Sequence, residues 1–557
     1  MRRYLVPIAL TAIVGAIIGL MIGLSAQSSI WPRLSLIQIV WSMTVGWVVG
    51  LGLSAALAWA IGRRVTFSAG REPRLWRRIG RVVLVLVALA PGVLWVVLPP
   101  LSGFSWTAVA TGRRPLDTRP NIVLIGIDAL RADHIGAYGS QQGLTPMLDE
   151  FAREATVYES AYAPAPWTLP SFGTIFTSRV PSVAGLIKAP GEDAASYAIR
   201  AMLPNRNPML SEQLHAAGYA TAAVLTNPFL AEERGWNRGF DGFFNADGPG
   251  IDSLISSDHT RAQGVTEHAR AWLQLNREEP FFLWVHYLDP HGPYESSDTP
   301  QQLRAKYPPD WTGSRLYYYE EIEGAAPEVR IRYAEFCREM YAEEVRYADR
   351  WVGELLAELK KSAAYRNSVV VIIADHGEEL FDHGGIDHGH SVHEEVLRVP
   401  LLVKWPAGVQ ADGRVSQTVG LADLTGTLAQ LAGAPSIDGL GRRVLPRRDR
   451  GVGGEVYSEG LMHGSEQTAL TTDDYRITYH PSGGEFEVYD RRTDRAEQFD
   501  LSHTGEAAEV RERLKLLTDE ALRNARETTP SEEGMPQPTE LPAETRRRLR
   551  TLGYLSD

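Results

Sequence analysis

The alternation of apolar runs with helical patterns from residue 121 onward constrains the fold of this chain most. The apolar runs are residues 121–127, 219–225, 281–287, 368–374 and 400–405, and the helix-like segments between them include residues 146–154, 209–217, 266–275 and 331–359. Such alternation predicts an α/β fold in which helices flank a mostly parallel sheet. Ligands of these sheets bind beyond the carboxyl ends of the strands, so polar residues at those ends are the candidate functional residues.

A smaller unit with a different pattern follows this core. Residues 475–479 and 485–489 flank the turn sequence Pro481-Ser482-Gly483-Gly484, which predicts a hairpin in a small antiparallel sheet. Residues 506–527 have the pattern of a charged amphipathic helix, and the proline-rich stretch 530–542 favours an extended chain. We therefore expect a core domain over residues 121–453 and a small C-terminal α+β subdomain with a tail over residues 454–557.

The first hundred residues depart from the globular pattern. Three apolar stretches, residues 4–24, 37–61 and 82–98, each approach the roughly 20 residues that cross a bilayer as a helix. The loop 62–81 is rich in arginine, so the positive-inside rule places it and the N-terminus in the cytoplasm. The sequence thus predicts three transmembrane helices over residues 1–101, a linker at 102–120, and a multi-pass cell-membrane protein whose remaining chain is extracytoplasmic. The first stretch also suits a signal peptide, and its cleavage would leave that orientation unchanged.

Charge and cysteine content argue against two other classes of protein. The formal net charge is -12, whereas a protein that binds nucleic acid needs a basic face. Cys337 is the only cysteine, so neither an internal disulfide nor a zinc finger can form. A buried apolar role on a helix is the simplest interpretation of Cys337.

Polar clusters follow three of the predicted strands. Asp128 follows the first, Asp375 and His376 follow the fourth, and the third is followed by a cluster that contains Asp289 and His291. A strand-end aspartate alone is commonly a helix cap or a turn residue. Because parallel strands end at one edge of a sheet, three such clusters together favour a common site there.

Histidines are concentrated behind the Asp375-His376 pair. Of the 14 histidines in the chain, four more lie within a short segment there, namely His383, His388, His390 and His393. A solvated polar loop would be the simplest interpretation of such a segment. Its closeness to a strand-end Asp-His pair favours metal binding or acid–base chemistry instead.

The segment 164–173 predicts a helix that begins close to Thr168. Prolines fix the entry to the helix, and Pro170 suits its first turn. Thr168 is then either a helix N-cap or a nucleophile. The helix dipole and a nearby metal ion would both favour the alkoxide form of a nucleophilic threonine.

Several segments together resemble the sulfatase family of the alkaline phosphatase superfamily. They read "NIVLIGIDALRADHIGAYG", "APAPWTLPSFGTIFTSRVP", "FFLWVHYLDPHGPY", "VVVIIADHGEELFDHGG" and "HEEVLRVPLLVKWPAG", with "VYDRRTDRAEQFDLS" and the terminal "LRTLGYL" further along. The resemblance runs from about residue 120 to the C-terminus. It implies an alkaline-phosphatase-like core at residues 121–453 that is catalytic and holds a divalent metal ion (Zn, Mn or Ca) at the sheet edge.

The resemblance also implies roles for individual residues. Asp128, Asp375 and His376 match metal ligands, and Thr168 matches the nucleophile, which also contacts the metal. His291 matches a residue that contacts the anionic group of the substrate. His388 has a spacing similar to that of a further active-site histidine in the phosphoethanolamine transferases of this superfamily. A second metal site could be formed by Asp289, His291 and His388.

The chain departs from the sulfatase pattern at the nucleophile. Sulfatases carry Cys or Ser there, which is oxidised to formylglycine and followed by x-Pro-Ser-Arg, whereas this chain reads Thr168-Leu169-Pro170-Ser171-Phe172. Threonine is not a substrate for that oxidation, so no formylglycine is expected. In addition, no lysine occurs between Lys361 and Lys404, where sulfatases usually hold one near the substrate.

These departures favour a membrane-bound, metal-dependent hydrolase or transferase that cleaves a phosphate mono- or diester through Thr168. The substrate would be an anionic ester of a glycan, a lipid or a small molecule. A true sulfatase that works without formylglycine is the second hypothesis. A non-catalytic ectodomain that binds a ligand is the third, and the complete set of Asp128, Asp375 and His376 argues against it.

Overall fold

A computed structural model describes residues 119–189, 191–205, 207–245, 261–276, 280–294, 298–434, 444–449, 454–505, 507–528, 549–550, 552 and 554. The three apolar stretches, nearly all of the predicted linker and the proline-rich stretch 530–542 lie outside these residues. Within the described ranges, no helix is both long enough and apolar enough to cross a bilayer. The transmembrane region and the linker therefore remain predictions.

An eight-stranded sheet forms the centre of the described structure, with the order β11-β2-β10-β7-β1-β6-β4-β5. Its strands are β1 (Asn121–Ile127), β2 (Thr156–Tyr158), β4 (Ala220–Leu225), β5 (Gly242–Asn245), β6 (Phe281–Tyr287), β7 (Ser368–Ile373), β10 (Leu401–Lys404) and β11 (Arg414–Val415). The run from β7 to β5 is parallel throughout. Its central strands are rich in branched apolar residues and are buried on both faces, as parallel sheets require.

The predicted α/β class is confirmed, but the sheet is mixed. β10 pairs antiparallel with both β7 and β2. The chain between β7 and β10 holds only the short strands β8 (Glu379–Leu380) and β9 (Ile386–Asp387) and the one-turn helix α14 (Glu394–Leu397). An antiparallel return needs no crossover helix, so this connection can stay at the sheet edge. The short strands β2, β5 and β11, of which β5 and β11 form the two edges of the sheet, were not predicted.

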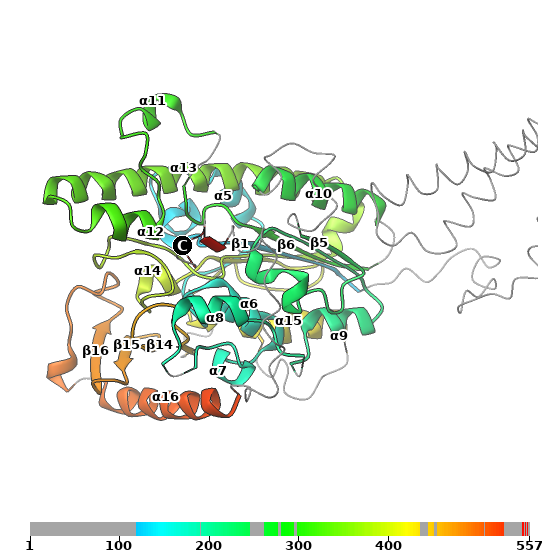
Figure 1. Cartoon of the computed structure of the whole chain (residues 1–557). Coiled ribbons are helices and arrows are strands. Elements are labelled where there is room, and N and C mark those ends of the chain that lie inside the picture. Colours follow the sequence, from blue (N-terminus) through cyan, green and yellow to red (C-terminus); the bar gives the residue numbers. More distant parts are fainter. Residues whose placement is uncertain are drawn as a thin grey trace, which may run out of the picture. The chain divides into compact units, whose positions relative to one another are not determined.

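Helices cover both faces of the sheet (Figure 1). One layer contains α5 (Pro146–Ala152), α10 (Ala262–Leu275) and the long α13 (Pro327–Lys360). The other contains α6 (Thr168–Thr177), α9 (Leu210–Ala216) and α15 (Asp423–Ala432). The four helices predicted between the strands are therefore present, with boundaries that move by a few residues. Cys337 is buried on α13, as expected.

The C-terminal part forms the predicted small antiparallel sheet. Its order is β13 (Glu455–Ser458), β14 (Thr468–Thr472), β15 (Tyr475–His480) and β16 (Glu485–Asp490), and β15 and β16 make the expected hairpin. The amphipathic helix α16 (Ala508–Thr528) lies beside this sheet in Figure 1. Leu514 of α16 is buried in a small apolar cluster with Leu470, Ile477 and Val488, which gives the sheet a core of its own.

Candidate active site

The carboxyl ends of three neighbouring strands supply most of the site. Asp128 directly follows β1, and Asp375 and His376 follow β7. His286 is the penultimate residue of β6. Because β1 pairs with β7 on one side and with β6 on the other, these ends are adjacent. All four side chains are completely buried, with an exposed fraction of 0%.

Two carboxylates and two imidazoles converge at this edge. His376 Nε2 lies 3.2 Å from Asp128 Oδ1 and 3.5 Å from Asp375 Oδ2. His286 Nε2 lies 3.6 Å from Asp128 Oδ2. Neither oxygen of the Asp375 carboxylate accepts a hydrogen bond from any residue that the structure describes. Burying a carboxylate in this way is costly unless a cation balances its charge.

The pKa shifts have the same electrostatic origin. Burial raises the pKa of Asp375 to about 7, and the neighbouring Asp128 carboxylate adds to the effect. Burial alone would lower the pKa of His376, but Asp375 and Asp128 raise it to about 10. A proton on His376 can therefore supply the positive charge that two close, buried carboxylates demand. Burial lowers the pKa of His286 to about 4, so this imidazole is neutral near pH 7 and offers a lone pair.

The donor set fits a divalent metal ion. His376 Nδ1 donates to the carbonyl of Gly377 over 2.8 Å, so Nε2, which faces Asp128 and Asp375, becomes a metal ligand when an ion takes the place of its proton. A backbone acceptor on the second ring nitrogen is a common feature of metal-binding histidines. One ligand atom from each of Asp128, His286 and Asp375 lies within 4.8 Å of the others. Mixed carboxylate and imidazole donors suit several divalent metals.

Thr168 is the first residue of α6 and does not cap it. The N-cap is Trp167, whose backbone is extended and whose side chain makes no capping hydrogen bond. Trp167 Nε1 donates to the carbonyl of Gly460 over 2.8 Å, and Ser171 Oγ donates to the carbonyl of Asp375 over 2.6 Å. These two bonds hold the first turn of α6 against the metal-binding edge, and the whole helix is buried.

The Thr168 hydroxyl faces the converging carboxylates and imidazoles. Its Oγ1 lies 3.3 Å from His376 Nε2 and 3.5 Å from Asp128 Oδ2. Asn227 Nδ2 donates to Asp128 Oδ2 over 2.8 Å and lies 3.3 Å from Thr168 Oγ1. The amide is held in this orientation because Asn227 Oδ1 accepts a hydrogen bond from the backbone of Phe229. A buried hydroxyl with these neighbours is placed to act as a nucleophile.

A second group of side chains lies beside these residues. His388 and His291 have ring centroids 4.7 Å apart, and the His388 ring lies 4.2 Å from that of His376. The hydroxyl of Tyr554 lies 2.8 Å from His388 Nε2 and 3.2 Å from His291 Nε2. The Tyr554 ring packs edge-on against Phe229. Burial raises the pKa of Tyr554 well above its usual value, so the residue remains a phenol.

The hydrogen bonds of this group fix where its protons lie. His291 Nδ1 donates to the carbonyl of Gly292, and His388 Nδ1 lies 2.8 Å from the carboxylate of Asp387. Both Nε2 atoms therefore carry lone pairs when the rings are neutral. Tyr554 has one proton to donate between them. Satisfying both contacts at once requires one further proton on an imidazole, so the group can hold a proton next to the reacting centre.

The structure separates some residues that the sequence grouped. Asp289 forms an ion pair with Arg261 over 2.6 Å and accepts a hydrogen bond from the backbone of Ala262. His291 and His388 do come together, but among the described residues no group of clustered ligand atoms includes Asp289. The Asp289 carboxylate thus already has a cationic partner, and the second metal site suggested for these three residues stays a prediction.

The dense histidine segment also divides. Only His388 joins the active site. His390 Nε2 pairs with Glu379 over 2.7 Å, and the rings of His383 and His393 stack on each other elsewhere. Closeness in sequence therefore overstated how many of these histidines act together.

Three site residues were not assigned a role from the sequence. Asn227 lies just beyond the carboxyl end of β4, so the strand-end rule would have found it. His286 is the penultimate residue of β6 and begins the polar cluster at the end of this strand, which gave a signal but no role. Tyr554 belongs to the terminal "LRTLGYL" segment, yet it is 166 residues from His388, and no local pattern indicates that contact.

Comparisons with known proteins agree with this fold. The sulfatase family model matches residues 120–434. A Delta 4,5-hexuronate-2-O-sulfatase of Bacteroides thetaiotaomicron is 24% identical over 473 residues, which cover 79% of this chain and 94% of that protein. The structure of a phosphonate monoester hydrolase of Agrobacterium radiobacter superposes with a TM-score of 0.53 at 15% identity and covers 74% of this chain and 96% of its own. A structure solved with its substrate D-glucosamine-2-N,6-O-disulfate gives a TM-score of 0.55 at 18% identity, with 74% and 100% covered.

Proposed function

The chain belongs to the sulfatase family, and we propose that it is a metal-dependent hydrolase or transferase that cleaves phosphate mono- or diesters through a covalent Thr168 intermediate. One observation carries the proposal. The hydroxyl of Thr168 lies at the buried start of α6, within 3.5 Å of Asp128 Oδ2 and His376 Nε2. Thr168 occupies the position that corresponds to the Cys or Ser of the sulfatase pattern.

The identity of the nucleophile favours phosphorus over sulfur. A formylglycine hydrate releases sulfate when its geminal diol collapses, and threonine has no such exit. Phe172 replaces the arginine of the sulfatase pattern and packs against Trp284 and His286 in the core. Lys404 points away from the site and donates to the carbonyls of Tyr365 and Ser368. The sulfatase pattern predicts an arginine and a lysine near the substrate. Neither Phe172 nor Lys404 provides such a cation here.

The proposed reaction assigns a task to each polar residue. When bound, the divalent metal supplies positive charge that favours the alkoxide form of Thr168. Thr168 Oγ1 forms a bond to phosphorus as the bond from phosphorus to the leaving oxygen breaks. His291, His388 and Tyr554 stand beside this centre and pass one proton to the leaving oxygen. Asn227 donates to an oxygen of the phosphoryl group once substrate displaces its present contact with Thr168.

The second half of the reaction restores Thr168. A water, or an acceptor alcohol in a transferase, gives up a proton to the histidine pair and attacks phosphorus of the phosphothreonine. The bond between phosphorus and Thr168 Oγ1 then breaks. The atoms and protons balance in either case, so the choice between hydrolysis and transfer depends on which hydroxyl compound occupies the site.

We also propose that the catalytic part acts outside the cell and is attached to the lipid bilayer by residues 1–101. The arginine-rich loop 62–81 between two apolar stretches supports this orientation. The substrate would be an anionic ester of a glycan, a lipid or a small molecule, and the hexuronate-2-O-sulfatase relative makes a glycan the first class to test. A periplasm-active reporter should work when fused after residue 102 and fail when fused after residue 71. The reverse pattern would overturn the orientation.

The decisive experiment combines a substrate screen with two substitutions of Thr168. Phosphate mono- and diesters should turn over faster than the matching sulfate esters. Thr168→Ala should fold, retain its metal and lose turnover by roughly three orders of magnitude or more. Thr168→Ser should retain part of the activity because it keeps the hydroxyl. A phosphorylated peptide containing Thr168 should be recovered from wild-type enzyme quenched in acid.

Three outcomes would contradict the proposal. A sulfatase rate well above both phosphatase rates would favour a true sulfatase that works without formylglycine. A normal rate in Thr168→Ala would exclude the covalent mechanism. An inactive wild-type protein on all ester classes would favour the non-catalytic, ligand-binding alternative.

A further inference from the structure

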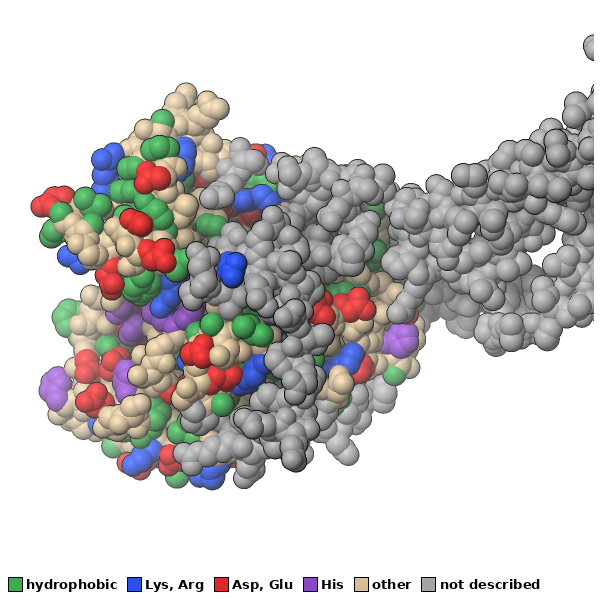
Figure 2. Space-filling model, in the orientation of Figure 1, with side chains coloured by type: hydrophobic (Ala, Val, Ile, Leu, Met, Phe, Trp, Pro, Cys, Tyr) green, Lys and Arg blue, Asp and Glu red, His purple; other side chains and the backbone are tan. Residues whose placement is uncertain are grey.

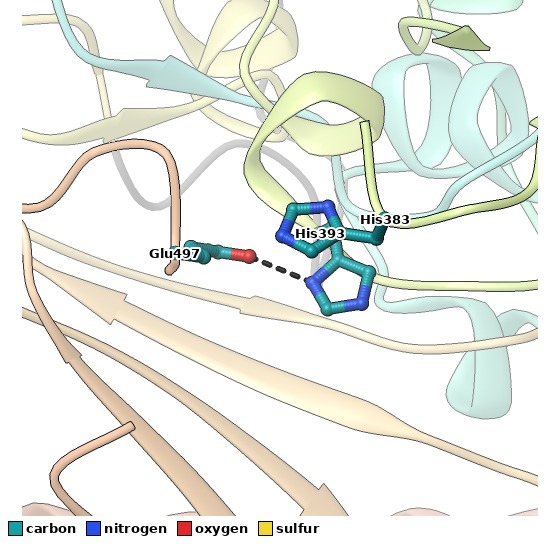
Figure 3. Close-up of side chains that lie close together, drawn as sticks. All are labelled: His383, His393 and Glu497. Carbon is teal, nitrogen blue, oxygen red and sulfur yellow. Dashed lines mark hydrogen bonds and ion pairs between the residues drawn. The ribbon is translucent and has the colours of Figure 1, made fainter. Parts of the chain in front are cut away.

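A second cluster of possible metal ligands lies outside the active site. It consists of His383, His393 and Glu497, here called the second histidine cluster (Figure 3). His383 lies in the loop after β8, and His393 is the residue before α14. Glu497 comes from the loop after β16, in the C-terminal part of the chain. Neither the sulfatase pattern nor the reaction proposed above uses these residues together.

The ligand atoms of the cluster are already close. One ligand atom from each of the three residues lies within 4.8 Å of the others. His393 Nδ1 and Glu497 Oε2 are 2.8 Å apart, and the two imidazole rings lie nearly parallel with their centroids separated by 3.9 Å. Figure 3 shows the Glu497 carboxylate directed at the ring of His393, with the ring of His383 beside it. The spread of distances resembles that around His376 in the active site.

Two buried atoms of the cluster lack a hydrogen-bond partner. Among the described residues, none forms a hydrogen bond with His383 Nε2 or with Glu497 Oε1. The nearest cation to Glu497 Oε1 is Arg476 Nε, at 3.5 Å, which is long for a charged pair. Glu497 also holds a left-handed backbone conformation, with φ of 53°, which costs a non-glycine residue about 1 kcal/mol. A side chain that receives a ligand can offset that cost.

The orientation of His383 fits a metal ligand. Its Nδ1 lies 2.7 Å from Glu395 Oε1, and this carboxylate turns Nε2 away toward the cluster. Metal-binding histidines generally donate their second N–H to a carboxylate or a carbonyl in this way. A simple ion-pair network leaves Nε2 without a partner. Metal binding requires neutral imidazoles, so a bound ion would take the place of any proton on Nε2.

A path from solvent reaches the cluster. His383 and Glu395 line a cavity of about 310 Å³ whose other charged walls include Arg131, Asp382 and Arg398. The side chains of His383 and His393 are 18% and 19% exposed, so an ion can enter and a water can complete its coordination. Two imidazoles and a carboxylate with a water are a common donor set for zinc.

From these observations we propose that His383, His393 and Glu497 bind a divalent metal ion of the zinc class, separately from the metal of the active site. The two histidines flank the segment that carries His388, so the ion would fix both ends of this segment. Glu497 would join the same segment to the C-terminal subdomain. The site is therefore a clamp that positions His388 for the reaction.

The test measures zinc binding in a full-length protein whose active site cannot hold metal. Asp128→Asn with Asp375→Asn provides this background, and we expect it to retain about one zinc ion per chain after dialysis. Adding His383→Ala and His393→Ala should abolish that zinc. Adding Glu497→Gln, which keeps the size of the side chain, should weaken zinc binding by about tenfold or more. With cobalt in place of zinc, the visible absorption of the bound ion should be lost in the same variants.

His390→Ala is the matched control, because His390 lies in the same segment but pairs with Glu379. It should leave zinc binding in the background protein unchanged. Circular dichroism establishes that each variant is folded, and if the double histidine variant is not, Glu497→Gln decides the matter. A background protein that binds no zinc at micromolar free metal, or zinc that survives Glu497→Gln undiminished, would overturn the proposal.

Discussion

The active site and the second histidine cluster use the same residue types in different surroundings. In the active site, Asp128, Asp375 and His376 follow buried parallel strands and have exposed fractions of 0%. In the second histidine cluster, the side chains of His383 and His393 are 18% and 19% exposed, and Glu497 comes from a different part of the chain. On the face of the molecule that Figure 2 draws, several histidine side chains lie close together. The sheet fixes the first set before any ion binds, whereas the second set depends on how two parts of the chain pack.

This difference indicates that two metal sites with similar ligands can have different functions. Burial, with the neighbouring Asp128 carboxylate, raises the pKa of Asp375 to about 7, so a cation bound there would be strongly stabilised. The second histidine cluster is open to a cavity and lies beside Arg476, so a bound cation would stabilise it less. We therefore expect the first ion to be essential for the reaction and the second to tune it.

The largest expected effect compares the same chemical change at both places. Asp375→Asn and Glu497→Gln each turn a carboxylate into an amide of nearly equal size. Asp375→Asn should lower kcat/KM for a phosphate ester by roughly three orders of magnitude, because metal charge at the reacting centre is worth several kcal/mol. Glu497→Gln should lower it by less than about tenfold, since it acts only through the position of His388. Equal losses would show that the two groups are not functionally distinct.

A smaller loss of kcat/KM is expected from a substitution of Tyr554, which contacts His388 and His291. Tyr554→Phe removes the hydroxyl shared by His388 and His291 but keeps the ring against Phe229. We expect kcat/KM to fall by roughly 10- to 100-fold and the melting temperature to stay nearly constant, because a buried proton-carrying contact is lost without a cavity.

The profile of kcat against pH distinguishes this role from a purely structural one. If Tyr554 holds the protons of the two histidines, Tyr554→Phe should move the basic limb of the profile. Tyr365→Phe is the control, since that hydroxyl contacts Glu154 away from the site, and it should change neither rate nor profile. An unchanged profile in Tyr554→Phe would leave the residue with a packing role only.

The two regions also differ in how much of them the sequence predicts. The strand-end rule located Asp128, Asp375 and His376, because a single strand and its next residues are local in sequence. The same rule could have found Asn227. Tyr554 and Glu497 reach their partners from over a hundred residues away, and their positions follow from packing of the C-terminal sheet and tail, which no local pattern encodes.

The fold divides along the same line. Apolar runs predicted the central strands, because a run of apolar residues by itself indicates a buried segment. Short strands such as β2 and β11 did not stand out, because two or three residues carry too little pattern. The direction of β10 was also missed, as it depends on the path of the preceding connection rather than on the strand itself.

Chelation should reveal a difference in rate between the two ions. The ligands of the active site are inaccessible to solvent, whereas His383 lines a cavity and the side chains of His383 and His393 are 18% and 19% exposed. A chelator should therefore remove the ion of the second histidine cluster roughly tenfold faster, because the first requires local opening of the buried edge. A metal-sensitive dye should record two phases of release, and activity should follow the slow one. A single phase that abolishes activity at once would remove this distinction.

The smallest effect concerns Glu395, which contacts the second histidine cluster without belonging to it. Glu395→Gln keeps an oxygen that can accept the His383 Nδ1 hydrogen bond but loses the negative charge. Removing such a supporting carboxylate weakens metal binding by about 10- to 100-fold. Because glutamine keeps an acceptor oxygen, we expect a loss of about tenfold. Zinc titration of the protein with Asp128→Asn and Asp375→Asn would measure this loss, while kcat/KM in the otherwise native protein should change by less than about twofold. Glu354→Gln, on the exposed surface of α13, serves as the control for loss of a carboxylate.

If Glu395→Gln bound zinc as tightly as the background protein, His383 would not be oriented by Glu395. If it instead abolished activity, the second histidine cluster would have to contact the reacting centre directly, and the separation of the two regions would fail.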